Sequence, residues 1–480
     1  MKITSMLFNR IKKYLLITLF LLILFFSNLS SAQGYKGTVN RDIDNYISNI
    51  FKRYQVPGGA VAVLKNGKVI HKRYYGDANL EVIKPIDNVT LFPLFSTTKI
   101  FTTTEVFHLI ESKKIALEDR LDTYLNDLPE QWNSIKIKNL LSHSSGLPDI
   151  VHYSNLEENQ AKNKIYEDVI LFKPGLRYDY NQTNFWLLNR IVQKKINVKL
   201  YEHIIDHQFF NAKDKVVFSG NYKERIKHRA IAYKSNGEDE LEVLKYQIPE
   251  YLYGAAGINL TLDEFIKWNE KFNKNFFIKE KTKELLWKPF RYEIDNNFSF
   301  GWKLNKGNKT ISYGFTGSAV TGFRKFTEHD LDIIFLTNGS KYTMKVDNII
   351  DTIVDIYDEN INGGNYVIYE AILKSFLNDN TSIARKTYYK LNNDNNIDFE
   401  SILNSIGKEF LRLKESELAV EVFKLNVIEH SDSSNTYDSL AVGYERLGNL
   451  DKAVENYKKS IELNHNNKYA RKRIKDLEKK

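Results

Sequence analysis

Leu91-Phe92-Pro93-Leu94-Phe95-Ser96-Thr97-Thr98-Lys99 ends with a serine three residues before a lysine. Residues 96–112 have the apolar spacing of a helix, so the serine hydroxyl and the lysine amine are predicted to share one helical face. Backbone N–H groups in the first turn of a helix lack helical partners, which leaves the amide of Ser96 free to hold an oxyanion. The pattern predicts a nucleophilic serine with Lys99 as its base. It is not specific by itself, because Ser405 also precedes a lysine at this spacing.

The residues on either side of this segment predict an antiparallel sheet with helices between its strands. Asn66-Gly67 separates two strand-like runs and is the strongest short signal for a β-hairpin. Strands at both ends of the region and helices between them indicate an α/β or α+β domain whose sheet collects both ends. The predicted strands are 60–64, 68–75, 310–313, 322–326 and 331–336, and residues 185–210 are predicted to be helical.

Five segments follow one another along the chain: Leu91–Lys99, Leu140–Pro148, Pro174-Gly175 with Tyr180-Asn181-Gln182, Gly314–Gly317 and Phe335–Gly339. In this order they resemble five motifs of the family of class C β-lactamases, D-alanyl-D-alanine carboxypeptidases and related esterases. These are the family's nucleophile motif, its leucine-leucine-threonine-histidine-threonine-serine-glycine-leucine-proline stretch, its tyrosine-serine-asparagine motif, its lysine- or histidine-threonine-glycine strand and its closing strand. The resemblance covers residues 40–360. It implies an antiparallel sheet flanked by helices, a helical subdomain, and an acyl-enzyme mechanism that needs no metal or cofactor.

The resemblance also implies roles for the matching residues. Ser96 would be acylated, and Lys99 and Tyr180 would share the proton transfers. The backbone amides of Ser96 and Ser318 would form the oxyanion hole. The implied substrate-binding residues are Gln182, Phe315, Thr316, Gly317 and Ser318.

Two residues depart from the family's pattern. Gln182 replaces an asparagine, so it keeps the carboxamide and adds a methylene. Phe315 replaces a lysine or histidine, which removes a cation beside the nucleophile and a natural partner for a substrate carboxylate. Among esters, amides and β-lactams, the sequence therefore favours an ester or amide without a terminal carboxylate. The alternative is a catalytically weak penicillin-binding-like module that binds cell-wall peptides while C-terminal helical repeats, described next, recruit a protein partner.

The chain changes character after Gly363-Gly364. Residues 366–480 lack a strand pattern and show a 34-residue period, which is the spacing of tetratricopeptide helix–turn–helix repeats. Leu403, Ile406, Gly407, Phe410, Ala419 and Phe423 correspond to Tyr437, Leu440, Ala441, Tyr444, Ala453 and Tyr457. Residues 366–391 are predicted to supply a third, degenerate helix pair, and a plain helical bundle is the alternative. Such repeats suit a protein partner or self-association.

The N-terminus has the order of charged, apolar and small residues typical of a secretory signal peptide. Lys12 and Lys13 precede an apolar run from Tyr14 to Phe26, which is too short to span the hydrocarbon core of a bilayer as a helix. The sequence predicts a signal peptide at 1–32, a hydrolase domain at 33–362 and a repeat domain at 366–480, in a secreted or periplasmic protein. An uncleaved membrane anchor is the alternative.

Composition and histidine spacing exclude or disfavour several functions. The chain has no cysteine, which excludes disulfides, a cysteine nucleophile and zinc–thiolate sites. The net charge of +9 is mild and scattered, so no nucleic-acid partner is expected. His203 and His207 have the spacing of zinc ligands, but no third ligand is apparent, so partly exposed helix histidines are expected instead. His143 is expected to be a packed, hydrogen-bonded residue rather than a catalytic one.

Overall fold

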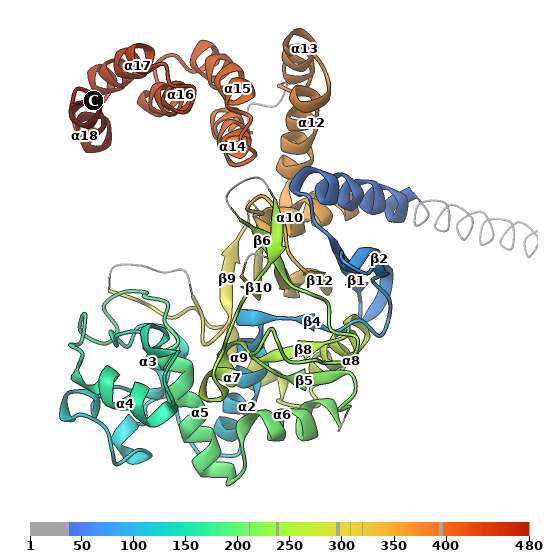
Figure 1. The fold of residues 1–480 in the computed structure, drawn as a ribbon, viewed down its shortest axis with the longest axis vertical. Helices are drawn as coiled ribbons and strands as arrows, with labels where there is room; N and C mark the ends of the chain where they lie inside the picture. The colour runs from blue at the N-terminus through green and yellow to red at the C-terminus, as the bar shows by residue number, and fades with distance from the viewer. Residues whose placement is uncertain are drawn as a thin grey trace, which may run out of the picture. The chain divides into compact units, whose positions relative to one another are not determined.

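The computed structural model describes residues 38–210, 212–236, 240–293, 298–307, 309–318, 320–392 and 397–479 (Figure 1). The chain divides into a short unit, residues 1–49, and a large unit, residues 50–480, which are described separately. Residues 38–49 of the short unit are helical, and the predicted signal peptide lies outside the described residues. Within the described residues, no helix combines the length and the apolar character needed to cross a membrane.

A seven-stranded antiparallel sheet forms the centre of the large unit, in the order β3-β2-β1-β12-β11-β10-β9. β1 pairs with β12, so strands from the two ends of the predicted hydrolase domain lie side by side, as expected. Asn66 and Gly67 join β1 to β2 with φ values of 51° and 69°, which confirms the hairpin, because such two-residue turns need positive φ. The strands are β1 Gly58–Lys65, β2 Lys68–Asn79, β3 Lys84–Pro85, β9 Lys303–Lys306, β10 Ile311–Gly317, β11 Thr321–Phe326 and β12 Leu331–Thr337.

Helices cover both faces of this sheet, which explains why β11 and β12 are buried along their whole length. Alternate residues of β11 point to opposite faces. Phe323 packs against Phe265 of α8 (Leu262–Asn273), with ring centroids 5.0 Å apart. The next residue, Arg324, donates to Asp351 of α10 (Val346–Tyr357) at 2.8 Å on the other face. The sheet is therefore the middle layer of three.

The helix that follows the nucleophile segment differs slightly from the prediction for residues 96–112. Phe95–Thr98 form a 3-10 turn, η1, and the α-helix α2 spans Lys99–Glu111. The helical segment predicted at 185–210 is divided into two helices, because Asn197 adopts φ 57° and ends the first of them. The other helices of the domain are α3 Ile137–Leu141, α4 Glu158–Glu167, α5 Thr183–Ile196, α6 Leu200–Phe209, α7 Tyr253–Ala256, α9 Glu280–Trp287 and α11 Glu359–Asn362.

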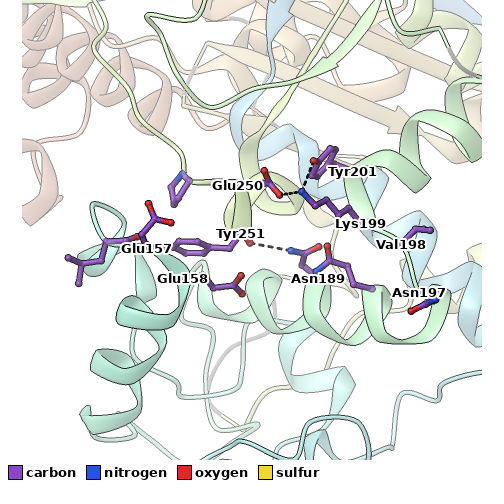
Figure 2. Close-up of a pocket in the computed structure, with 12 residues that line it drawn as sticks. Glu157, Glu158, Asn189, Asn197, Val198, Lys199, Tyr201, Glu250 and Tyr251 are labelled. Atoms are coloured by element: carbon purple, nitrogen blue, oxygen red, sulfur yellow. Dashed lines mark hydrogen bonds and ion pairs between the residues drawn. The ribbon is translucent and has the colours of Figure 1, made fainter.

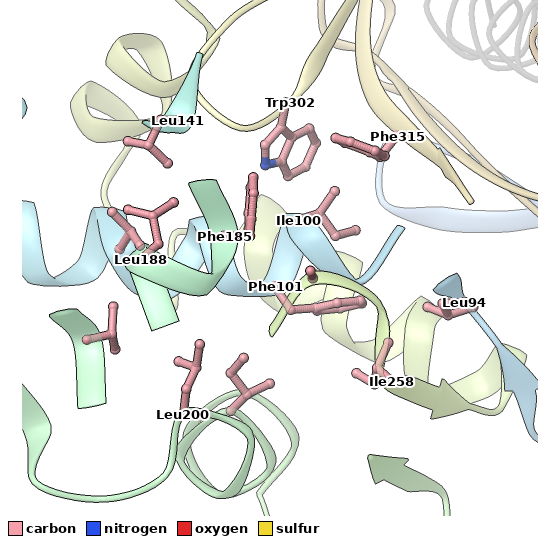
Figure 3. Close-up of a cluster of buried hydrophobic side chains, with 14 of the residues drawn as sticks. Leu94, Ile100, Phe101, Leu141, Phe185, Leu188, Leu200, Ile258, Trp302 and Phe315 are labelled. Carbon is pink, nitrogen blue, oxygen red and sulfur yellow. The ribbon is translucent and has the colours of Figure 1, made fainter. Parts of the chain in front are cut away.

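Smaller sheets and a continuous apolar core connect the helices to the main sheet. Figure 3 shows part of this core, where Ile100 and Phe101 of α2 lie among side chains from distant segments. Trp302 is fully buried and packs on Phe272, so it belongs to the core rather than to a cleft. The short strands are β4 Phe92–Pro93, β5 Val216–Phe218 and β8 Ile258–Leu260 in one sheet, and β6 Tyr233–Ser235 and β7 Leu241–Val243 in another.

The described residues after Gly364 are all helical or in connections between helices, as predicted. Gly363 and Gly364 both have positive φ, which ends α11 before the next helix begins. Successive helices from α14 to α17 pack on their neighbours in the sequence. The helices are α12 Asn365–Asn378, α13 Thr381–Leu391, α14 Phe399–Arg412, α15 Ser416–Glu429, α16 Ser434–Arg446, α17 Leu450–Leu463 and α18 Lys468–Leu477.

Candidate active site

Ser96 and Tyr180 form a direct hydrogen bond, although they are 84 residues apart in the sequence. Tyr180 donates its phenolic O–H to Ser96 Oγ at 2.9 Å. Ser96 lies in η1, the turn that leads into α2. Tyr180 lies just before α5, whose residues are buried against α2. The fold thus places a hydroxyl that can exchange a proton beside the predicted nucleophile.

Lys99 is fully buried beneath this pair. Its ammonium donates to Gln182 Oε1 at 2.8 Å and to the Ala255 carbonyl at 2.9 Å. Among the residues that the structure describes, Lys99 forms no ion pair. The charge of the Lys99 ammonium is therefore balanced by dipoles and ring faces rather than by a carboxylate. Because no carboxylate neutralises it, this charge is available to stabilise a developing anion. Nζ lies 5.0, 5.1 and 5.8 Å from the ring centroids of Tyr180, Phe185 and Phe315.

Gln182 is held through its side chain and through its backbone. Its side-chain oxygen accepts the hydrogen bond from Lys99, and its backbone N–H donates to Asp149 Oδ1 at 2.9 Å. Asp149 also accepts from the backbone N–H of Val151, while burial raises the pKa of its carboxyl above the ordinary value. The sequence analysis did not identify Asp149 or the Ala255 carbonyl. Neither position carries a pattern that distinguishes it from an ordinary loop or helix residue.

The end of β10 lies directly against the nucleophile segment. A Cβ on Gly317 would be 2.0 Å from the Leu94 carbonyl oxygen, so only glycine fits at this approach. Thr321 Oγ1 donates to the same carbonyl at 3.0 Å. Ser318 follows Gly317 with a φ of 47°. The predicted oxyanion residues Ser96 and Ser318 therefore lie on two segments that are in close contact.

Phe315 is buried within this site, where the family pattern has a cation. Its ring centroid is 6.2 Å from that of Tyr180, and its side chain is only 6% exposed. Figure 3 shows it above Ile100 and beside Trp302 in the apolar core. The position that carries a lysine or histidine in the family is here apolar. Thr316, the next residue of β10, is partly exposed.

His143 packs under Tyr180 instead of reaching Ser96. It is almost fully buried, and its ring centroid is 4.6 Å from that of Tyr180. The side chain of Asn184 lies 3.0 Å from Nδ1, and the backbone N–H of Asn181 donates to the same atom. This arrangement agrees with the prediction of a packed, hydrogen-bonded residue. Burial, with a smaller contribution from Lys99, holds the pKa of His143 well below its usual value.

Replacement of His143 by asparagine is expected to change how stability depends on pH. In the unfolded chain His143 takes up a proton below pH 6.5, whereas in the folded chain it stays neutral, so folding loses stability as the pH falls below that value. The slope for one such group is about 1.4 kcal/mol per pH unit. His143→Asn should remove this slope, and asparagine tolerates the φ of 51° at this position. Denaturant unfolding at pH 7.5, 6.0 and 5.0 measures how the free energy of unfolding of each protein depends on pH. Equal slopes for the wild type and the variant would contradict the prediction.

A cavity adjoins the predicted site. It has a volume of about 330 Å³, and its lining includes Phe95, which directly precedes Ser96, and Ser318, a predicted oxyanion residue. A wider one of about 800 Å³ lies near Asn189 and Tyr251 (Figure 2) and has none of the predicted site residues in its lining. The smaller cavity is the better candidate for binding a substrate, because Ser318 and the residue before Ser96 line it.

Comparisons with known proteins agree with this arrangement. A family model described as Beta-lactamase matches residues 43–356. Penicillin-binding protein 4* of Bacillus subtilis (strain 168) is 25% identical over 312 residues, which is 59% of this chain and 69% of that relative. The octameric penicillin-binding protein homologue from Pyrococcus abyssi has a similar structure, with a TM-score of 0.59 and 20% identity over 70% of this chain and 81% of that chain.

A second solved structure, of a different enzyme, has the same fold. The D-amino acid amidase from Ochrobactrum anthropi SV3, complexed with L-phenylalanine amide, has a TM-score of 0.57 and 17% identity, and the match covers 66% of this chain and 99% of that chain. The family match covers well over half of the chain and includes Ser96, Tyr180 and β10. The chain belongs to the β-lactamase family of serine hydrolases.

Proposed function

We propose that this protein hydrolyses esters or amides through an acyl-enzyme on Ser96. The single observation that carries the proposal is the 2.9 Å hydrogen bond between Tyr180 and Ser96 above the buried ammonium of Lys99. A module without catalytic activity would not need a nucleophile, a proton carrier and a buried cation in contact with one another. The presence of all three groups therefore favours an enzyme over a module that only binds peptides.

In the proposed reaction Ser96 Oγ attacks the substrate carbonyl carbon and forms a new C–O bond. For this step Tyr180 has first released to solvent the proton that it donates to Ser96 Oγ in the resting site, and the nearby ammonium of Lys99 stabilises the resulting phenolate. The Ser96 hydroxyl proton passes to the phenolate oxygen and from there to the leaving group as its bond to the carbonyl carbon breaks. Water then attacks the acyl-enzyme by the reverse sequence and releases the acid. The amides of Ser96 and Ser318 are proposed to hold the oxyanion.

The proposed substrates lack a carboxylate near the scissile bond. Phe315 offers no charge to such a group, and Phe95, Leu244 and Val320 contribute apolar surface to the adjoining cavity. Lys234 and Lys341 also line the cavity, and they are the cations that would bind a carboxylate if this proposal is wrong.

Phe315→His is expected to raise kcat/KM for a carboxylate-bearing ester by about 10- to 100-fold, because a charge-assisted hydrogen bond is worth about 1.5–3 kcal/mol. The matched neutral ester should gain nothing. Phe315→Leu is the control, since it removes the ring without adding a cation. Hydrolysis assays measure the ratio of kcat/KM for the carboxylate-bearing ester to kcat/KM for the neutral ester. An unchanged ratio in Phe315→His, or a wild type that already prefers the carboxylate, would overturn the proposed specificity.

The proposed nucleophile can be tested without knowing the substrate. The protein is treated with a fluorophosphonate, and its intact mass is measured. We expect one adduct on the wild type and none on Ser96→Ala. Ser405→Ala is the matched control, because Ser405 has the same spacing to a lysine but is exposed on α14. A folded wild type that stays unlabelled, or an adduct that persists on Ser96→Ala, would contradict the proposal.

We infer that the C-terminal helices are tetratricopeptide repeats. The inference is supported by the close packing of α14 on α15, where a Cβ on Gly407 would lie 2.2 Å from the ring of Phe423. These two residues occupy small and large positions of the 34-residue period. Gly448 adopts φ 76° in the turn between α16 and α17, where the second copy predicts it. A protein partner for these helices, and a secreted or periplasmic location, stay predictions from the sequence.

A further inference from the structure

A cluster of two histidines and a glutamate lies outside the Ser96 site. Glu105 is on α2, and His203 and His207 are on α6, which packs against α2. His203 Nε2 is 2.8 Å from Glu105 Oε1, and His207 Nδ1 is 2.9 Å from Glu105 Oε2. The expectation that the two histidines lack a third ligand is therefore wrong. Glu105 precedes His203 by 98 residues, so sequence spacing could not reveal it.

The cluster has a buried side and an accessible side. The Glu105 side chain is 0% exposed, whereas those of His203 and His207 are 26% and 28% exposed. Within the described residues, no lysine or arginine pairs with Glu105. A buried carboxylate needs a compensating positive charge. In this position the charge has to come from the imidazoles or from a cation that enters past them.

Further hydrogen bonds fix the orientation of the carboxylate. Gln208 Nε2 donates to Glu105 Oε2 at 3.2 Å and to the Phe101 carbonyl at 2.9 Å. The indole N–H of Trp268 donates to Gln208 Oε1 at 2.9 Å, so the amide of Gln208 cannot turn without losing all three bonds. Supporting hydrogen bonds of this kind orient the ligands in metal sites and contribute to affinity.

We propose that Glu105, His203 and His207 bind a divalent transition-metal cation of the Zn²⁺ type. Their ligand atoms all lie within 4.8 Å of one another. Zn²⁺ bonds of about 2.0–2.2 Å in tetrahedral geometry place ligand atoms about 3.3 Å apart, so small side-chain movements would admit the ion. Imidazole nitrogen and carboxylate oxygen are suitable donors for this class of metal. Three protein ligands and an exposed side leave a fourth position for water.

A metal bound at this position would join α2 to α6. Lys99 lies on α2 six residues before Glu105, about 9 Å along the helix axis. The site is thus separate from the reacting groups, but it fixes the helix that carries the buried lysine. Because the ion would bind the folded chain, it should raise the melting temperature, and the increase should grow with the logarithm of the ion concentration above its Kd. The proposal does not depend on the hydrolase activity.

The test uses the purified full chain without a polyhistidine tag, first treated with EDTA and then freed of it. Calorimetric titration with Zn²⁺, in competition with a chromophoric chelator, is expected to give one ion per chain. His203→Gln and His207→Gln should each weaken binding by at least about a hundredfold, and Gln208→Ala by about 10- to 100-fold, the usual effect of losing a supporting hydrogen bond. Co²⁺ should give the visible absorption of a four-coordinate site in the wild type and not in the histidine variants.

Matched controls separate this site from adventitious binding. His465→Gln removes an exposed histidine from the connection between α17 and α18 and should leave affinity unchanged. Glutamine at 203 can still donate to Glu105, so that variant should keep the wild-type melting temperature in EDTA. A wild type that binds Zn²⁺ no more tightly than His203→Gln would overturn the proposal. An equal loss of affinity in His465→Gln would do so as well.

Discussion

Ser96→Ala is expected to lower kcat for a simple ester by about 10⁴- to 10⁶-fold, the range found when the nucleophile of a serine hydrolase is removed. The acyl-enzyme cannot form without Ser96 Oγ, and the remaining oxyanion and binding contacts supply only a small acceleration. Tyr180 loses one hydrogen-bond partner, so the fold should be retained. Steady-state hydrolysis and circular dichroism of the two proteins measure both effects.

Residual activity of Ser96→Ala would show whether another residue is the nucleophile. If a folded Ser96→Ala protein keeps more than a tenth of the wild-type activity, the nucleophile is another residue. Ser318, which adjoins the same cavity, would be the next candidate. Ser144 and Ser145 are poorer candidates because both are fully buried and hydrogen-bonded within the domain.

Tyr180→Phe is expected to lower kcat by about 10²- to 10⁴-fold, the usual contribution of a positioned acid–base group. The substitution removes one oxygen atom and keeps the ring that packs on His143 and faces the Lys99 ammonium. The stability of the fold should therefore change little, and labelling by a fluorophosphonate should slow in parallel with hydrolysis. The hydrolysis rate and the melting temperature are the two quantities to compare.

Tyr178→Phe is the matched control for this substitution. Tyr178 also packs against His143, with ring centroids 5.9 Å apart, but Ser96 Oγ receives its hydrogen bond from Tyr180. We expect Tyr178→Phe to leave kcat within a few-fold of the wild type. Equal losses in the two variants would mean that the aromatic cluster acts by packing alone, and Tyr180 would then have no catalytic role.

Local signals in the sequence predicted the elements of the hydrolase domain well. The turn at Asn66-Gly67 and the late strands at 322–326 and 331–336 were correct because turn chemistry and strand periodicity are local properties. The prediction that residues 185–210 are helical was confirmed except at the break between α5 and α6. Asn197 adopts a left-handed conformation that ends α5, and asparagine does not by itself distinguish a helix end from a helix interior.

The sequence by itself determined the family, the order of the motifs and the identity of the predicted nucleophile, because these depend on residue types at fixed spacings. Only the tertiary structure decided which groups meet. Asp149 reaches Gln182, the Ala255 carbonyl receives Lys99, and Glu105 joins the two histidines of α6. Each of these contacts links residues that are dozens of positions apart. Their distances are set by how helices pack on a shared core, which no local pattern in the sequence records.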